Sequence, residues 1–294
     1  MTSIEQIEEK AIESAEGVGK IGTQVSLGVH HAVMAAGEPG RKVADALHGT
    51  WLGHPLHPVL TDLTIGAWTM GLVFDGLGAI TDSDKARGIG DTLTLAGTIS
   101  AVPTAITGLT DFSTFPDWSA NTATWHAAVN TVGLGLYSWS VRERRRGNHG
   151  RGAIISSIAF GFTCLASWLG GTLVYKQKVG VNHAESFDKP KRWKAVLAAS
   201  ELSERKLKRV EVDGKGVLLY RTKSDIFAIG SVCSHAGGPL EEGKVEGNCV
   251  SCPWHDSVFD LRDGSIVHGP ATQAQPRFEV RERDGEIEIR LPQA

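Results

Sequence analysis

The sequence is short of cysteine and of net charge. Four Cys among 294 residues are too few for a disulfide scaffold, and a formal net charge of −3 gives no reason to expect a nucleic-acid partner. The acidic start, MTSIEQIEE, lacks the apolar run of a cleavable signal peptide, which we therefore do not expect. Two features stand out instead: charge-free stretches in the first half, and clustered Cys and His in the second.

Charge-free runs are the main feature between residues 55 and 175. About 20 apolar residues are needed for a helix to cross the hydrocarbon core of a bilayer, and four stretches are long enough. The first is the weakest, because it contains Asp62 and Asp75. Gly, Ala, Ser and Thr are frequent in these stretches, and small residues let membrane helices pack closely. The sequence therefore predicts four transmembrane helices, at residues 58–80, 92–110, 122–141 and 152–175.

The residues before these runs show a helical spacing. Apolar side chains recur every three to four positions over residues 3–37, which predicts an amphipathic helix broken near Gly17 or Gly19. Residues 21–37 carry no formal charge, so this helix lies either on a membrane surface or against the rest of the protein. The sequence Gly37-Glu-Pro-Gly40 is expected to form a turn.

After a polar linker at residues 183–194 the pattern changes to short alternating runs. Alternation of apolar and polar residues is typical of half-buried strands, and Asp-Gly pairs between such runs are typical of hairpin turns. Strands are predicted at residues 209–212, 217–220, 226–229, 277–280 and 286–290, with turns at Asp213-Gly214, Asp263-Gly264 and Asp284-Gly285. Residues 195–294 are therefore expected to form a small antiparallel β-sandwich or barrel.

Two short motifs in this β region carry thiol and imidazole groups. Cys233-x-His235 and Cys252-x-x-His255 each offer one Cys and one His from a short loop. Two Cys and two His are a possible ligand set for a structural zinc, although zinc motifs more often pair Cys with Cys and His with His along the chain. Alternating Cys and His on two loops is the arrangement of a Rieske [2Fe–2S] centre, where two thiolates hold one iron and two imidazoles the other.

Residues 195–294 resemble a Rieske domain. The resemblance rests on three stretches, namely Cys233-Ser-His-Ala-Gly-Gly-Pro-Leu with its continuation to Gly243, Cys252-Pro-Trp-His-Asp-Ser-Val-Phe-Asp260, and His268-Gly-Pro-Ala271 with Pro276. It implies a [2Fe–2S] cluster with Cys233 and Cys252 on one iron and His235 and His255 on the other. It also implies that the cluster is surrounded by Leu240, Trp254, Ser257 and Pro270.

Departures from the family pattern indicate the subtype. Rieske proteins of quinol-oxidising cytochrome complexes carry an extra Cys in each loop, where this chain has Gly238 and Trp254. A Ser and a Tyr that hydrogen-bond to sulfur in those proteins match Ser257 and Phe259 here. Fewer hydrogen bonds to sulfur predict a reduction potential below theirs, within the broad Rieske range of about −150 to +300 mV. The domain therefore resembles the Rieske ferredoxins and related oxygenase or reductase subunits.

The other two cysteines are not expected to bind the cluster. Cys249 stands three residues before Cys252, so the two together resemble the Cys-x-x-Cys motif of a zinc site. We expect Cys249 to be an ordinary strand residue instead. Cys164 lies inside an apolar run, where we expect it to pack against neighbouring helices.

The membrane half resembles an uncharacterised four-helix bacterial membrane family over about residues 50–182. His54-Pro-Leu-His57-Pro, Asp111-Phe, Asp117-Trp118 and His126 carry the resemblance. With four antiparallel helices, the three histidines His54, His57 and His126 share one membrane face with the Rieske domain. Ionisable groups at a membrane boundary suggest function, so these histidines are candidates for a haem, metal or quinone site. The alternative, that they cap helices and bind water or headgroups, is favoured.

The orientation follows from the distribution of basic residues. The loop at residues 142–151 is strongly basic, and the positive-inside rule mildly favours that loop in the cytoplasm and the Rieske domain on the external face. We therefore expect a multi-pass protein of a bacterial inner or plasma membrane, in contact with the lipid bilayer.

Together these patterns predict an all-α membrane four-helix bundle followed by an all-β Rieske domain. The expected function is one-electron transfer between a membrane redox partner, either quinol or cytochrome, and an acceptor, rather than self-contained catalysis. Two alternatives remain open, an electron-transfer component of a Rieske-type oxygenase or reductase system and a membrane redox sensor. The expected parts are an N-terminal amphipathic helical segment at 1–50, the transmembrane domain at 51–182, the linker at 183–194 and the Rieske domain at 195–294.

Overall fold

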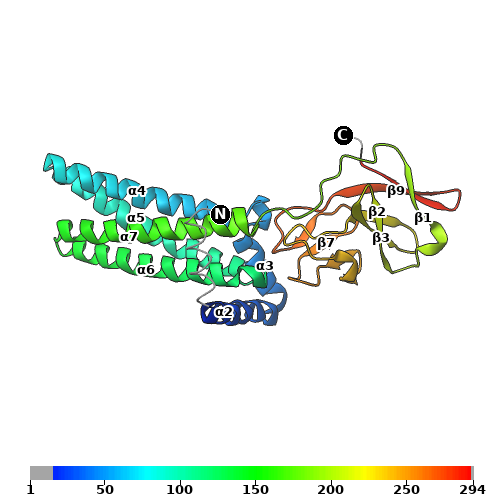
Figure 1. Cartoon of the computed structure of the whole chain (residues 1–294), viewed down its shortest axis with the longest axis horizontal. Coiled ribbons are helices and arrows are strands. Elements are labelled where there is room, and N and C mark those ends of the chain that lie inside the picture. The colour runs from blue at the N-terminus through cyan, green and yellow to red at the C-terminus, as the bar shows by residue number, and fades with distance from the viewer. Residues whose placement is uncertain (1–15, 293–294) are drawn as a thin grey trace. The chain divides into compact units, whose positions relative to one another are not determined.

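The computed structural model describes residues 16–292 and divides the chain into two units (Figure 1). The first is helical and contains Leu56–Val179 together with the described residues before Met34. The second contains the β-strands from Gly180 onward and also Met34–Pro55. The first part of the predicted helix at residues 3–37 lies outside the described residues.

Four long helices form the body of the helical unit, in antiparallel hairpins that Figure 1 shows side by side. All four predicted helices are present. They are α4 (Leu56–Thr81), α5 (Asp84–Phe112), α6 (Ala120–Arg145) and α7 (His149–Gly171), the last continued by a π-helical turn at Thr172–Lys176.

Three helices among the described residues are long and apolar enough to cross a membrane: Leu56–Thr81, Asp84–Phe112 and His149–Lys176. The prediction of a fourth crossing at residues 122–141 is not supported, because α6 is long enough but too polar by composition. It carries Asn121, His126 and Asn130, and it ends in the charged sequence Arg142-Glu-Arg-Arg145.

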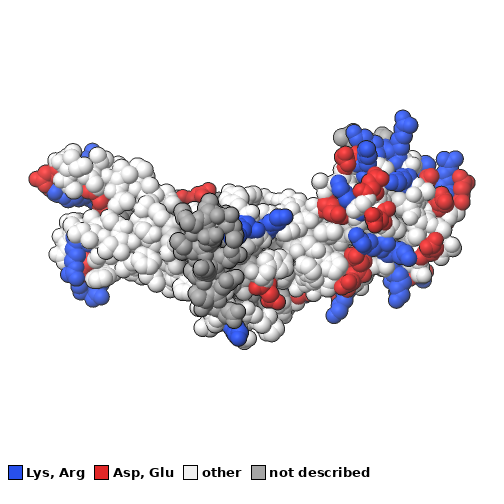
Figure 2. All heavy atoms as spheres, in the orientation of Figure 1, with Lys and Arg blue, Asp and Glu red and all other residues white. Residues whose placement is uncertain are grey.

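Small residues let the helices approach closely. Trp68 of α4 stacks on Tyr137 of α6 with ring centroids 3.8 Å apart, and a side chain at Gly97 of α5 would collide with the Trp68 ring. The apolar residues Leu63, Ile99 and Ile154 instead point outward. Figure 2 shows few charged residues along the helices on the visible face, and charges gathered at the helix ends and over the β region. An uncharged, apolar flank is what a lipid-facing surface requires.

Helix α2 (Glu16–Ala35) contains both Gly17 and Gly19, and the residues before Glu16 lie outside those that the structure describes, so a break near Gly17 stays a prediction. Its Ser26 hydroxyl donates a hydrogen bond to the Phe112 carbonyl at 3.0 Å, and Gly22 leaves no room for a side chain beside Thr124. Of the two alternatives for this helix, the structure therefore shows packing against the rest of the protein.

The β unit contains a six-stranded and a four-stranded antiparallel sheet. All five predicted strands are confirmed, and the three Asp-Gly turns have their Gly in the left-handed region. The order in the larger sheet is β1-β10-β9-β4-β3-β2, and in the smaller sheet β5-β6-β7-β8. The strands are β1 (Lys194–Ala198), β2 (Leu207–Val212), β3 (Lys215–Arg221), β4 (Ile226–Gly230), β5 (Lys244–Glu246), β6 (Cys249–Ser251), β7 (Val258–Asp260), β8 (Ile266–His268), β9 (Arg277–Arg283) and β10 (Glu286–Arg290).

Strand β3 separates two apolar cores because side chains alternate between the faces of a strand. Leu218 and Tyr220 enter a core that also contains Cys233 and Cys252. Val217 and Leu219 enter the other core, which contains Phe278 of β9. The first core therefore places the candidate ligands at the base of the two loops that carry them.

A further helix of the N-terminal segment belongs to the β unit. Helix α3 (Gly37–His48) occupies the position where Gly37-Glu-Pro-Gly40 was expected to form a turn, so that prediction is wrong. Pro39 is compatible with the first turn of a helix, where its missing N–H has no partner to lose. Gly49 ends α3 with φ +83° and donates its N–H to the Asp45 carbonyl, and the short helix η1 (Thr50–Leu52) follows.

Candidate metal centre

The first candidate ligand loop follows strand β4. The backbone N–H of Cys233 donates to the Gly238 carbonyl and that of Gly237 donates to the Cys233 carbonyl, each at 2.9 Å. Gly237 has φ +83°, a conformation that side-chain-bearing residues rarely adopt. This tight turn fixes Cys233 and His235 relative to each other.

The second loop joins β6 to β7 in the smaller sheet. Cys252 N–H donates to the Ser257 carbonyl at 2.8 Å, and Asp256 N–H donates to the Cys252 carbonyl at 3.2 Å. Asp256 has φ +59°, and Asp is one of the few residues besides Gly that tolerates this region. The loop therefore presents Cys252 and His255 from a closed turn, as the first loop does for its pair.

The two loops bring the four predicted ligands together as two pairs. Cys233 and Cys252 are only 1% and 2% exposed, and their thiols are in hydrogen-bonding contact. The rings of His235 and His255 have centroids 4.9 Å apart and meet edge-on at 85°. Within residues 16–292 no group of three or more His, Cys, Asp or Glu is arranged around one metal position, as a Cys₂His₂ zinc would require.

The electrostatics favour the metal-binding form at Cys252 and His235, but not at Cys233. The pKa of Cys252 is lowered to about 7, chiefly by a hydrogen bond from the Cys233 thiol and in smaller part by the backbone N–H groups of Trp254 and His255. The same contact raises the pKa of Cys233, and burial adds to the rise. Burial lowers the pKa of His235 well below its usual value, as does the neighbouring His255. A thiolate and a neutral imidazole are the forms in which these side chains bind metal.

Other predicted residues surround the four ligands. Leu240 and Phe259 are fully buried in the core that contains both cysteines. Pro270 is also buried, and the buried Ser257 hydroxyl accepts a hydrogen bond from Ala271 N–H at 3.1 Å. Trp254 differs, because 49% of it is exposed. These residues exclude water on the protein side and leave an aromatic side chain at the surface beside His255.

The residues present fit a [2Fe–2S] cluster. The donor set is two thiols and two imidazoles in separate pairs, which matches two irons of two protein ligands each. Gly238 supplies a second observation, because a Cβ there would lie 2.7 Å from the Cys252 sulfur and 3.1 Å from the Trp254 ring. Glycine at this position keeps the space around the thiols free.

The remaining two cysteines lie apart from this set. Cys249 is the first residue of β6, as expected, and its thiol has a pKa raised by burial. Cys164 is exposed on α7, so the expectation that it packs between helices is wrong. Helix periodicity turns it toward the outer face of the bundle, which sequence spacing alone had not resolved.

The three candidate histidines His54, His57 and His126 occupy hydrogen-bonded positions. His57 Nδ1 lies 2.9 Å from the Thr104 carbonyl, and His126 Nδ1 lies 2.8 Å from the Ala166 carbonyl. His126 Nε2 also contacts Asn130 at 3.2 Å, whereas His54 bonds only its neighbour's carbonyl, that of Pro55. His57 keeps the stronger case as a ligand, since both ring nitrogens of His126 face protein partners. A haem or quinone site here stays a prediction.

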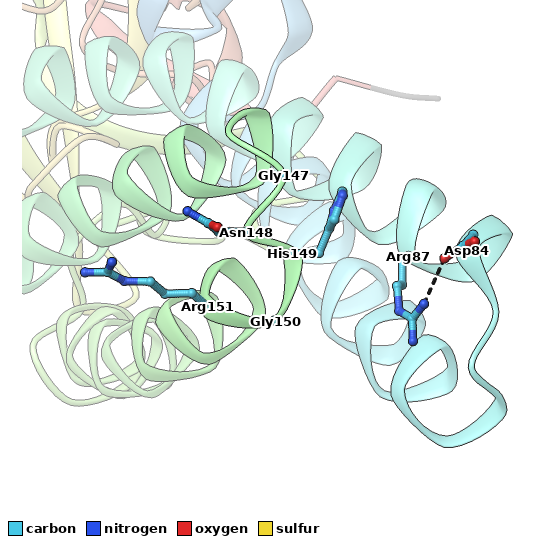
Figure 3. A pocket seen from close by; sticks show the side chains of 7 residues that line it. All are labelled: Asp84, Arg87, Gly147, Asn148, His149, Gly150 and Arg151. Atoms are coloured by element: carbon cyan, nitrogen blue, oxygen red, sulfur yellow. Dashed lines mark hydrogen bonds and ion pairs between the residues drawn. The ribbon is translucent and has the colours of Figure 1, made fainter.

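The opposite end of the bundle carries a buried ionic network. The side chain of Arg144 is 3% exposed and pairs with Asp75 of α4 and Asp91 of α5. Asp91 also pairs with His149. His149 lies at the edge of a hollow between the start of α5 and the turn that joins α6 to α7 (Figure 3). Figure 3 shows Arg87 directed to Asp84 within this hollow. The network ties the helices of the bundle together and has no cluster ligand in it.

Comparisons with known proteins match the two halves separately. A family model described as "Rieske [2Fe-2S] domain" matches residues 192–279, and one described as "Predicted membrane protein (DUF2231)" matches residues 53–183.

Individual relatives match the β region. The anthranilate 1,2-dioxygenase ferredoxin subunit of Burkholderia cepacia is 30% identical over 34% of this chain and 92% of its own length. The ferredoxin component of the naphthalene 1,2-dioxygenase system of Pseudomonas putida is 30% identical over 31% of this chain and 86% of its length. A solved ferredoxin of carbazole 1,9a-dioxygenase from Nocardioides aromaticivorans matches 34% of this chain and 98% of its own, at 26% identity and a TM-score of 0.32.

Proposed function

Because the chain belongs to the Rieske [2Fe–2S] family, through its residues 192–279, we propose that it is a membrane-anchored electron-transfer protein. The proposal rests above all on the two facing loops that pair two buried thiols and two imidazoles. A [2Fe–2S] cluster held by Cys233, Cys252, His235 and His255 would take up and release one electron at a time.

The cysteines, the histidines and their neighbours have different roles in holding the cluster. The two cysteines supply thiolates from the interior, where Leu240 and Phe259 keep water away from them. The two histidines supply imidazoles from the outer parts of the loops, and the partly exposed Trp254 beside His255 offers a contact surface to a redox partner. An exposed aromatic side chain next to a metal ligand is suited to close contact with an electron donor or acceptor.

The helical unit supports the anchoring part of the proposal. Its three apolar helices and uncharged flanks suit a lipid environment, and anchoring would bring the cluster to a membrane-resident carrier. We therefore propose quinol or a membrane cytochrome as one partner. The basic residues at the α6–α7 turn favour that turn in the cytoplasm and the cluster on the external face.

A second function has its own support. The dioxygenase ferredoxin subunits that match this chain at 30% identity favour delivery of electrons to an oxygenase or from a reductase. A membrane redox sensor, in which reduction changes the packing of the helices, is the third possibility. Protease protection of α4–α7 that is identical in the oxidised and reduced protein would remove the sensor.

A redox titration of detergent-purified protein tests the main proposal. The visible and EPR spectra should report a single one-electron Rieske centre, and a short-chain quinol in excess should reduce it. His235→Ala should abolish the signal, whereas Cys249→Ala, the matched thiol control, should retain it. A centre that is reduced by a ferredoxin reductase but not by quinol would favour the oxygenase-system alternative.

A further inference from the structure

The segment at residues 34–55 contacts residues 268–273, here called the covering loop, which contain the Pro270 that the resemblance to the Rieske family places beside the cluster. The Asp45 carboxylate accepts a hydrogen bond from His268 Nδ1 and another from the backbone N–H of Gly269, each at 2.8 Å. The Nδ1 atom is the donor, because its partner is a carboxylate. One side chain of α3 therefore holds two consecutive residues at the start of the Pro270 loop.

Further contacts tighten the same interface. A Cβ at Gly269 would lie 2.9 Å from Thr50 Cγ2 and 3.6 Å from His48 Cδ2, so glycine is needed for the close approach. The Gln273 side chain donates to the Gly53 carbonyl at 2.5 Å. His48 is only 4% exposed. The contact thus extends from α3 through η1 to both ends of the covering loop.

The covering loop is in turn bonded to both ligand loops. Ala271 N–H donates to Ser257 of the second loop, and the Ser234 hydroxyl of the first loop donates to the Gln273 carbonyl at 2.6 Å. Asp45 therefore acts on the ligands through one intermediate loop, which makes it a positioning residue.

Helix α3 lies outside the two recognised domains. The family matches begin at residue 53 and at residue 192, so α3 belongs to neither. The segment also continues directly into α4, the first apolar helix. The Asp45 carboxylate that binds the covering loop therefore comes from the residues that precede α4 in the chain.

We propose that residues 34–55 form an additional wall of the metal centre, in which Asp45 positions the 268–273 loop and lowers the reduction potential. This inference rests on the proposed electron-transfer function. The reduced centre carries one more negative charge than the oxidised centre, so a fixed carboxylate nearby disfavours reduction. The same carboxylate holds the loop closed over the ligands.

Hydrogen exchange of the full chain in detergent tests the positioning. In Asp45→Ala, the amides of residues 268–273 and of α3 should exchange at least tenfold faster than in the wild type. The control Glu282→Ala removes one surface ion pair, with Arg221, from β9 and should leave these amides unchanged. Unchanged exchange of both segments in Asp45→Ala would overturn the positioning role.

A redox titration tests the electrostatic part. Asp45→Asn keeps the side-chain size and an acceptor for Gly269 N–H, and should shift the potential in the positive direction, while the charge-matched control Glu282→Gln should not. An unshifted potential in Asp45→Asn would overturn this part. A wild-type protein without any Rieske signal would instead refute the proposed function, and the exchange experiment would still decide the role of Asp45.

Discussion

A single methyl group added at position 238 is expected to block the metal centre while leaving the fold intact. The Cβ of Gly238→Ala would lie 2.7 Å from the Cys252 sulfur, whereas ordinary contact begins near 3.4 Å, so the sulfur must retreat by about 0.7 Å. Metal–ligand distances tolerate deviations of about 0.2 Å. The displacement is therefore more than a bound thiolate can accommodate.

The same displacement costs little when no metal is bound. A free Cys side chain can rotate away from the new methyl group, and φ at residue 238 is outside the left-handed region, so the backbone accepts Ala. We expect the metal-free variant to lose about 1 kcal/mol of stability, the low end of the usual cost of overpacking. Loading with iron and sulfide should in contrast fall at least tenfold.

Two assays on the same preparations separate these effects. Iron and sulfide content with the visible spectrum reports loading, and thermal unfolding of the metal-free protein reports the fold. Gly66→Ala, at a glycine with nothing within 4 Å of its Cβ position, is the matched control and should load normally. Full loading of Gly238→Ala would refute the argument that this glycine keeps the thiol space free.

Three further predictions concern other parts of the chain. Phe259→Tyr, which offers a hydroxyl in the core beside the cysteines, should raise the potential in a redox titration; an unchanged or lower value would contradict it. Arg144→Met leaves the buried Asp75 carboxylate without its ion-pair partner, whereas Asp91 keeps His149, and should cost about 3–5 kcal/mol, seen as a lower Tm in detergent. The exposed Arg151→Met should cost less than about 1 kcal/mol. The hydrogen bond from Arg262 lowers the pKa of Asp260, so its stabilisation is present above the usual value of 3.8 and lost as the pH falls through the lowered pKa. Arg262→Ala should therefore unfold more easily than wild type in denaturant at pH 7, and the difference should shrink at pH 3; a constant difference would refute the pairing.

The sequence predicts most of the β unit because its signals are local. The Asp213-Gly214 and Asp284-Gly285 turns have left-handed backbone that these residue types favour, and the strands beside them alternate as expected. Strands β5 to β8 have only three residues each, too few for a periodic pattern to emerge. The ligand loops were found nevertheless, because their motif is specific.

What the sequence does not predict depends on contacts distant in the chain. Asp45 reaches His268 across more than two hundred residues, and the Gly-Glu-Pro-Gly start of α3 is more typical of a turn. Helix α6 shows that absence of charge does not by itself predict a membrane-spanning helix. A charge-free run can still contain too many Asn, His and Thr side chains to be apolar enough. Absence of charge is a weaker signal than presence of apolar surface.

The most direct test of the central claim is pulsed EPR of the reduced, detergent-purified full chain. We expect a Rieske-type signal with couplings to two histidine nitrogens, one of which is lost in any His235 variant that still assembles a centre. A [2Fe–2S] signal without nitrogen coupling, or stoichiometric zinc in place of iron, would contradict the assignment of Cys233, His235, Cys252 and His255 as ligands.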